Sequence, residues 1–255
     1  MFLPSRGTPY DLRFALFGIP VTVSPFFWVT AMLLGFHWLS LEPGGPANLL
    51  AWVLCVFVSL ILHEFGHALT MRAFGHRPEV VLHHFGGYAT YRGRETAGRS
   101  LLITMAGPGV QLLLFVALTI GASLMLGINP AILLSPSNLF VAPWFVGESF
   151  SQAGFFDAGT PLYAITVSLL WINLIWPLFN LLPVLPLDGG RILASVLELS
   201  RVRRAEMWAQ RVGVVLGTLV AVYFLFNGAF LIGAMFAFMA MANYQALQGE
   251  RMEGV

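Results

Sequence analysis

Residues 59–74 read SLILHEFGHALTMRAF, in which two histidines and a carboxylate stand among mostly apolar side chains. The residues just before them, WVLCVFV at 52–58, suit a lipid environment. Ionisable groups within a membrane span are costly and rare, and each marks a functional site by default. The stretch therefore predicts a spanning helix that carries a site, and the rest of the chain has to account for both.

The composition indicates a polytopic membrane protein. Of the 255 residues, 58% are hydrophobic and 10% are charged, and the mean hydropathy is +0.80. Soluble domains average about 25% charged residues, so a lipid bilayer is the expected surrounding. The formal net charge of +1 argues against nucleic acid as a partner, because that would need a basic stripe. The single cysteine, Cys55, cannot form an internal disulfide.

A spanning helix needs about 20 mostly apolar residues, and six segments qualify. The first is short and contains His37, Gly107–Pro108–Gly109 interrupts the third, and a turn at Asn227–Gly228 separates the last two. The predicted spans are 25–41, 49–73, 101–126 and 162–182, with a fifth and a sixth between 204 and 247. Residues 80–91, VVLHHFGGYATY, predict short strands around Gly86–Gly87. The expected fold is all-α and polytopic, with six transmembrane helices and a short re-entrant or cytoplasmic β-hairpin.

Arginine supplies every positive side chain of the protein, and its distribution gives an orientation. The N-terminal segment, the loops 74–100 and 183–204, and the C-terminal tail all hold arginines, whereas the intervening loops hold none. The positive-inside rule assigns the arginine-bearing side to the cytoplasm. Both termini are therefore expected in the cytoplasm, and the strict alternation supports six spans.

The motif His63-Glu64-Phe65-Gly66-His67 has the spacing of a zinc site. Two histidines one helical turn apart project from the same face, so both imidazoles can bind one ion while Glu64 reaches a metal-bound water as general base. The alternative is a polar cluster that is hydrogen-bonded between helices. A catalytic zinc also needs a third protein ligand and an open position for water.

Asp188 is the candidate third ligand. It lies in NLLPVLPLDGGR, residues 180–191, where Pro183 and Pro186 break the preceding helix beside a carboxylate. The same aspartate could equally be the N-cap of a helix that starts near Arg191. The second and fourth predicted spans run in the same direction, and His67 and Asp188 both lie a few residues before an arginine. The two motifs are therefore expected at similar depth, near the cytoplasmic end.

Four motifs together carry a resemblance to a known family. They are HEFGH at 63–67, FGGYA at 85–89, AGP at 106–108 and NLLPVLPLDGGRIL at 180–193. In this combination, the chain from Pro20 to Leu193 resembles the site-2 protease family of intramembrane zinc metalloproteases. The resemblance implies a core of three helices, here the second to the fourth spans. It also implies one zinc ion per chain, bound by His63, His67 and Asp188, with Glu64 as catalytic acid and base.

The resemblance assigns further roles near the metal. Asn180 matches an asparagine that helps to position substrate or the oxyanion. Phe85, Gly86 and Gly87 are similar to a re-entrant hairpin that receives the substrate as an added strand. Many relatives carry an asparagine shortly after the AGP motif, where this chain has Gln111, which offers the same amide on a longer side chain. Residues 1–255 are expected to form one membrane-embedded metalloprotease domain, with its core at about 49–193 and no room for a PDZ or CBS domain.

The expected activity is that of an intramembrane zinc metalloprotease in a bacterial cell membrane. It would hydrolyse a peptide bond within or near the transmembrane segment of a single-pass membrane protein and release a fragment to the cytoplasm. A regulatory membrane partner is possible. The rival hypothesis is a zinc transporter or a metal-dependent scaffold. A transporter should carry ligands through both leaflets, whereas Glu64 and Asp188 lie near one side.

Overall fold

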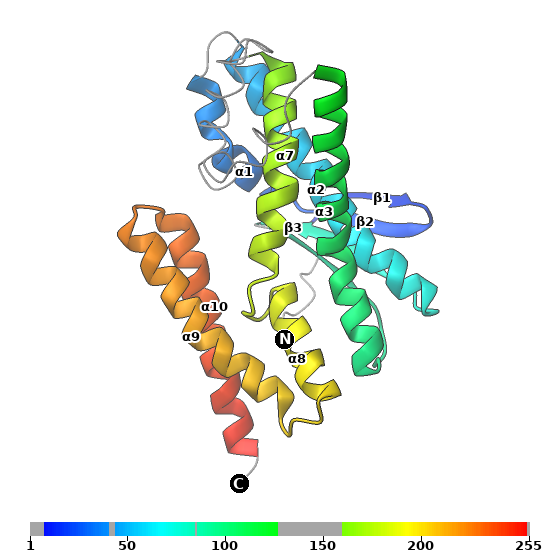
Figure 1. The fold of residues 1–255 in the computed structure, drawn as a ribbon, viewed down its shortest axis with the longest axis vertical. Coiled ribbons are helices and arrows are strands. Elements are labelled where there is room, and N and C mark those ends of the chain that lie inside the picture. Colours follow the sequence, from blue (N-terminus) through cyan, green and yellow to red (C-terminus); the bar gives the residue numbers. More distant parts are fainter. Residues whose placement is uncertain (1–7, 41–43, 85, 127–159, 254–255) are drawn as a thin grey trace. The chain divides into compact units, whose positions relative to one another are not determined.

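The computed structural model describes residues 8–40, 44–84, 86–126 and 160–253 (Figure 1). Within these ranges the protein is mostly helical, with one small sheet. In chain order the elements are β1 (Leu12–Leu16), β2 (Ile19–Val23), α1 (Pro25–Leu34), the 3₁₀ helix η1 (Phe36–Ser40), α2 (Gly45–Ala73), β3 (Glu79–His83), β4 (Gly86–Thr90), α3 (Ala97–Leu126), α7 (Pro161–Asn180), α8 (Asp188–Leu199), α9 (Ala205–Phe226) and α10 (Phe230–Glu253).

The chain divides into two compact units. The first comprises residues 1–93 and 109–177, and it holds the sheet, α1, α2, most of α7 and the C-terminal part of α3. The second comprises residues 94–108 and 178–255, and it holds the first turns of α3 together with α8, α9 and α10. The division runs through α3 between Pro108 and Gly109.

The sheet of the first unit has four strands in the order β1-β2-β3-β4. The strands β3 and β4 pair antiparallel from Glu79↔Thr90 to His83↔Gly86, which confirms the hairpin expected at 80–91. The strands β1 and β2 form a second hairpin, and β2 pairs in parallel with β3. The expectation of an all-α fold with one hairpin is therefore wrong in this respect.

The N-terminal hairpin was not predicted because its turn lacks the residues that are typical of a two-residue hairpin turn. Phe17 and Gly18 connect the strands, and both have positive φ, 50° and 74°. Two-residue turns of this kind normally contain Asn-Gly or Asp-Gly. A bulky Phe17 in the first position conceals the signal.

Five described helices, α2, α3, α7, α9 and α10, are long and apolar enough to cross a membrane. The protein is accordingly a multi-pass integral membrane protein. A sixth span at 25–41 is not confirmed, because α1 has 10 residues and so is about 15 Å long, half the thickness of a hydrocarbon core.

The end of α1 has a local cause at Gly35. A Cβ at this residue would lie 2.1 Å from Cδ1 of Trp52, so the indole of α2 lies directly against the backbone. The indole Nε1 of Trp52 also donates to the carbonyl of Ala31 at 2.9 Å. After Gly35 the chain continues as η1 rather than as a longer helix.

The predicted interruption of the third span is also wrong. α3 runs without a break from Ala97 to Leu126 and contains Pro108. A proline removes one helical donor, here the partner of the Thr104 carbonyl. Helices in membrane proteins tolerate such residues because neighbouring groups restore the lost bonds.

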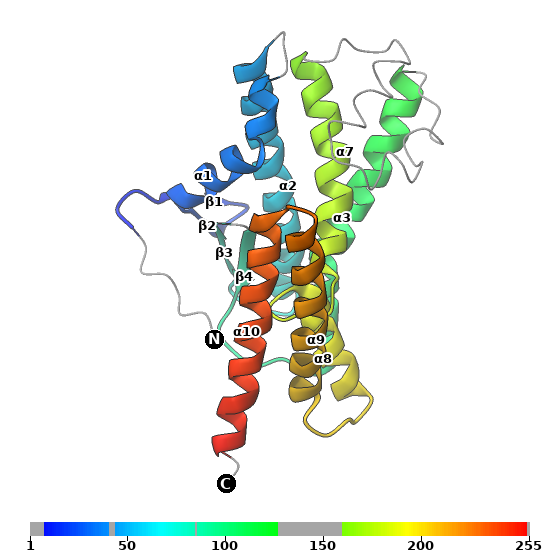
Figure 2. The same ribbon diagram turned by 90° about the vertical axis from the view of Figure 1, so that its left-hand side faces the viewer.

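The two helices predicted between 204 and 247 are confirmed as α9 and α10, which lie side by side (Figures 1 and 2). The turn between them is at Asn227 and Gly228, and Gly228 has a φ of 78°. At Gly213 a Cβ would lie 2.8 Å from Oδ1 of Asn243, so a missing side chain allows the helices to approach closely.

Candidate metal centre

Helix α2 presents His63 and His67 on one buried face. The two side chains are 2% and 6% exposed, and their Nε2 atoms lie 3.1 Å apart. A tetrahedral zinc ion with Zn–N bonds of about 2.0–2.1 Å places two ligand nitrogens about 3.3 Å apart. The two imidazoles therefore have the spacing that one zinc ion requires.

A chain of polar contacts continues from the other side of His63. Its Nδ1 lies 2.8 Å from Oε1 of Gln111, a fully buried residue of α3. Nε2 of Gln111 donates to the backbone carbonyl of Ser59 at 3.3 Å. Nδ2 of Asn173, on α7, donates to the hydroxyl of Ser59 at 2.9 Å. These contacts link α2, α3 and α7 inside the first unit.

Glu64 is 4% exposed and lies against the backbone of β4. A Cβ on Gly87 would be 2.7 Å from Cγ and 2.8 Å from Oε1 of Glu64. At Gly86 the nearest atom to an added Cβ would be Cζ2 of Trp176, at 3.5 Å. The structure thus brings Gly87 and Glu64 together, whereas Phe85 lies outside the described residues.

Asp188 is the first residue of α8 and is half-buried in the second unit. The N-cap position belongs to Leu187, so the N-cap role considered for Asp188 is wrong. The two glycines that follow have little room for side chains. A Cβ on Gly189 would lie 2.1 Å from the carbonyl oxygen of Leu181, and one on Gly190 would lie 2.5 Å from the nitrogen of Leu185. The loop therefore packs tightly against the first turn of α8. This packing fixes the position of Asp188 at the start of the helix.

His63 and His67, in the first unit, can each offer one ligand nitrogen to a metal ion, and Asp188, in the second unit, stays the predicted third ligand with a carboxylate oxygen to offer. Two imidazoles and one carboxylate are a common ligand set of catalytic zinc. Asn180, the remaining predicted site residue, is the last residue of α7 and is partly exposed.

The sequence did not predict the hydrogen bond between Ser59 and Asn173, which lies next to His63. The contact between Ser59 and Asn173 joins residues 114 positions apart, and no sequence pattern gave that pairing. The available signal was position, because Ser59 is one helical turn before His63 and shares its face.

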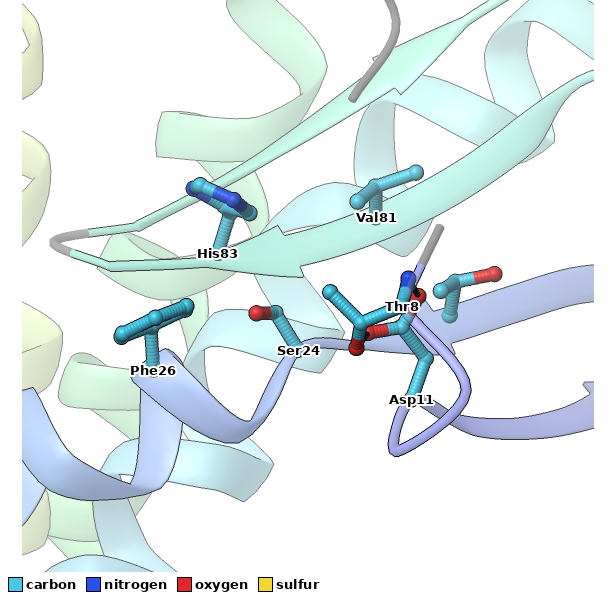
Figure 3. A pocket seen from close by; sticks show the side chains of 7 residues that line it. Thr8, Asp11, Ser24, Phe26, Val81 and His83 are labelled. Carbon is cyan, nitrogen blue, oxygen red and sulfur yellow. Dashed lines mark hydrogen bonds between the residues drawn. The ribbon is translucent and has the colours of Figure 1, made fainter. Parts of the chain in front are cut away.

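A separate small cavity of ≈ 40 Å³ lies beside the sheet (Figure 3). Its lining residues are Thr8, Asp11, Thr22, Ser24, Phe26, Val81 and His83. The hydroxyl of Thr8 donates to Asp11 at 2.6 Å, and this bond is the main reason that the pKa of the Asp11 carboxyl is lowered. Loss of hydration on burial lowers the pKa of His83. No sequence pattern predicts this cavity.

Comparison with known proteins places these features in a family. The model of peptidase family M50 matches residues 51–221. The protein sll0528 of Synechocystis sp., which carries a zinc-metalloprotease name, is 33% identical over 195 residues, covering 71% of this chain and 42% of the relative. Zinc metalloprotease MJ0392 of Methanocaldococcus jannaschii is 28% identical over 195 residues, covering 74% of this chain and 46% of the relative. The chain spans less than half the length of these relatives.

A solved structure shares the fold. The site-2 protease from Methanocaldococcus jannaschii superimposes with a TM-score of 0.58 at 23% sequence identity. The match covers 93% of this chain and 95% of that chain. The fold of this chain, with its small sheet and apolar helices, is therefore already known from a solved structure.

Proposed function

The chain belongs to peptidase family M50, and on that premise we propose that it is a zinc metalloprotease of the site-2 type. Its reaction is hydrolysis of a peptide bond within or near the transmembrane segment of a membrane-protein substrate. The observation that carries the proposal is the buried pair His63 and His67, whose Nε2 atoms converge at 3.1 Å beside the buried Glu64. An ordinary hydrogen-bonded cluster does not require two imidazole nitrogens to converge on one point, next in sequence to a buried carboxylate.

The proposed zinc ligands are His63, His67 and Asp188. Three protein ligands leave a fourth position open, as catalysis requires. When bound there, zinc supplies Lewis-acid chemistry toward the scissile carbonyl and toward water. We expect one ion per chain, because these three residues supply a single set of ligands.

Glu64 is proposed as the acid and base of the reaction. As a carboxylate next to a ligand histidine, it takes a proton from the attacking water and returns it to the leaving amine. The backbone of Gly87 lies against this carboxylate and restricts where it can point. Asn180 is proposed to donate a hydrogen bond to the tetrahedral oxygen as charge develops on it.

Strand β4 is proposed to hold the substrate. It is the last strand in the order of the described sheet, so no strand of the described residues pairs with its outer edge, where an extended peptide could pair. A substrate helix hides its carbonyls in its own hydrogen bonds and must unwind before cleavage, and pairing with β4 compensates for the bonds that it loses. Gly86 and Gly87 begin this strand, and Phe85 precedes it.

The orientation of the site is part of the proposal. The arginine distribution supports a cytoplasmic side for both termini and for the metal end of α2, and the released fragment is therefore expected to enter the cytoplasm. A single-pass membrane protein is the substrate that suits such a site, a bacterial cell membrane is its setting, and a membrane partner is the proposed means of regulation.

The test uses the full chain in proteoliposomes with a single-pass model substrate. Glu64→Gln removes the base but none of the proposed ligands, so cleavage should stop while the zinc content stays at one ion per chain. Cleavage that persists in this variant would contradict the proposal. Zinc flux across the vesicles without cleavage would favour a transporter instead.

A further inference from the structure

We propose that Gln111 is a positioning residue for the metal centre. It holds His63 in the tautomer with the proton on Nδ1, so that Nε2 presents its lone pair next to Nε2 of His67. The inference rests on the proposed zinc site, and it assigns a purpose to the amide that stands where many relatives carry an asparagine.

The contacts of the Gln111 amide determine its orientation. Its two ends face the carbonyl of Ser59 and Nδ1 of His63. A carbonyl oxygen can only accept hydrogen bonds, so the NH₂ group of Gln111 must face Ser59. The flipped amide would put two acceptors together. Because Gln111 is 0% exposed, no solvent is available to relieve that clash.

With its NH₂ group on Ser59, Gln111 presents Oε1 to His63, at 2.8 Å. Oε1 can only accept, so Nδ1 of His63 must carry the proton and donate it. In a neutral imidazole the other nitrogen then has the lone pair. Nε2 is the atom that faces His67, so the tautomer is the one that a metal requires.

Ser59 anchors the Gln111 amide to helix α2. The carbonyl of Ser59 accepts the helical bond of residue 63, and its second lone pair is available to Gln111. Asn173 donates to the hydroxyl of Ser59 and to the carbonyl of Leu169. The amide of Gln111 is thereby anchored to the same helical turn that carries His63. Outer partners of this kind orient metal-binding histidines and raise their basicity.

Two variants separate hydrogen bonding from packing. Gln111→Leu keeps a similar volume and removes both polar contacts. Gln111→Glu keeps an oxygen that accepts from Nδ1, and when protonated it also donates to Ser59. Thr119→Val is the matched control, because Thr119 is buried on the same helix and donates only within it, to Phe115 at 2.8 Å.

The measurements are made on the purified full chain in detergent. Nitrogen NMR of the zinc-free protein reports which imidazole nitrogen of His63 carries the proton, and competition with a chelator reports zinc affinity. We expect Gln111→Leu to lose the Nδ1-protonated form and to bind zinc about 10–100-fold more weakly, as for other outer partners. Gln111→Glu and Thr119→Val should both stay near the wild-type affinity.

The outcomes are decisive in either direction. A wild-type His63 protonated on Nε2 overturns the inference, whether or not any variant folds. So does an unchanged zinc affinity in Gln111→Leu, or an equal loss in Gln111→Glu. Neither measurement requires cleavage, so a protein that depends on Gln111 for zinc but cleaves nothing would contradict the proposed protease and leave this inference standing.

Discussion

Replacing Gly87 by alanine tests the contact between β4 and the proposed base. The new Cβ would lie 2.7 Å from Cγ of Glu64 and 2.6 Å from Cδ2 of Leu82. Carbon atoms pack at about 3.5–4.0 Å, so Glu64 has to move by about 1 Å. A misplacement of about 1 Å can cost about 100-fold in rate, which corresponds to about 2.7 kcal/mol in the activation barrier.

The assay is cleavage of the single-pass substrate in proteoliposomes, with the zinc content measured on the same samples. Gly87→Ala should lower kcat about 100-fold and leave zinc bound, because neither histidine is displaced. Gly86→Ala should lose far less, since its Cβ would meet Trp176 at an ordinary 3.5 Å. Gly121→Ala should be neutral, with nothing within 4 Å of the added atom. A wild-type rate for Gly87→Ala, or equal losses at Gly86 and Gly87, would refute the reasoning.

Three further predictions concern the metal and the packing. Asp188→Asn should weaken zinc binding by more than the about 10–100-fold typical of an outer partner, and a zinc titration that matches the wild type would remove Asp188 from the ligand set. A chelator should abolish cleavage, and added zinc should restore it; activity that survives metal depletion would argue against zinc. Gly35→Ala should destabilise the first unit by about 1–3 kcal/mol through overpacking against Trp52, measured as a lower Tm in detergent, and an unchanged Tm would contradict the close contact.

The sequence predicted the parts of the fold that depend on long, uniform patterns. Helix α2 and the pair α9 and α10 are predictable because about 20 consecutive apolar residues indicate a transmembrane helix. The hairpin at β3 and β4 was expected from Gly86 and Gly87 between β-forming residues. Within the motif, the convergence of His63 and His67 follows from the helical repeat alone.

The predictions from sequence were wrong where the packing of distant residues overrides a local sequence pattern. The first span ends early because Trp52 occupies the space beside Gly35. The residues near Gly35 do not predict this contact, because Trp52 is 17 positions away in the sequence. Pro108 predicts a break, because the sequence does not show that α3 continues past it. The hydrogen bond from His63 to Gln111 joins residues 48 apart, and such pairings follow from packing rather than from local preference.

The parallel pairing of β2 with β3 has a practical consequence for anyone who trims or tags this protein. Val21, Thr22 and Val23 are in register with Val80, Val81 and Leu82, so the hairpin of β1 and β2, Leu12 to Val23, supports the strand pair that borders Glu64. A two-stranded hairpin alone is marginally stable at best in water. Deleting the N-terminus for expression would therefore loosen a region some 60 residues downstream, and a truncated protein that proves inactive should not be mistaken for one with a damaged metal centre.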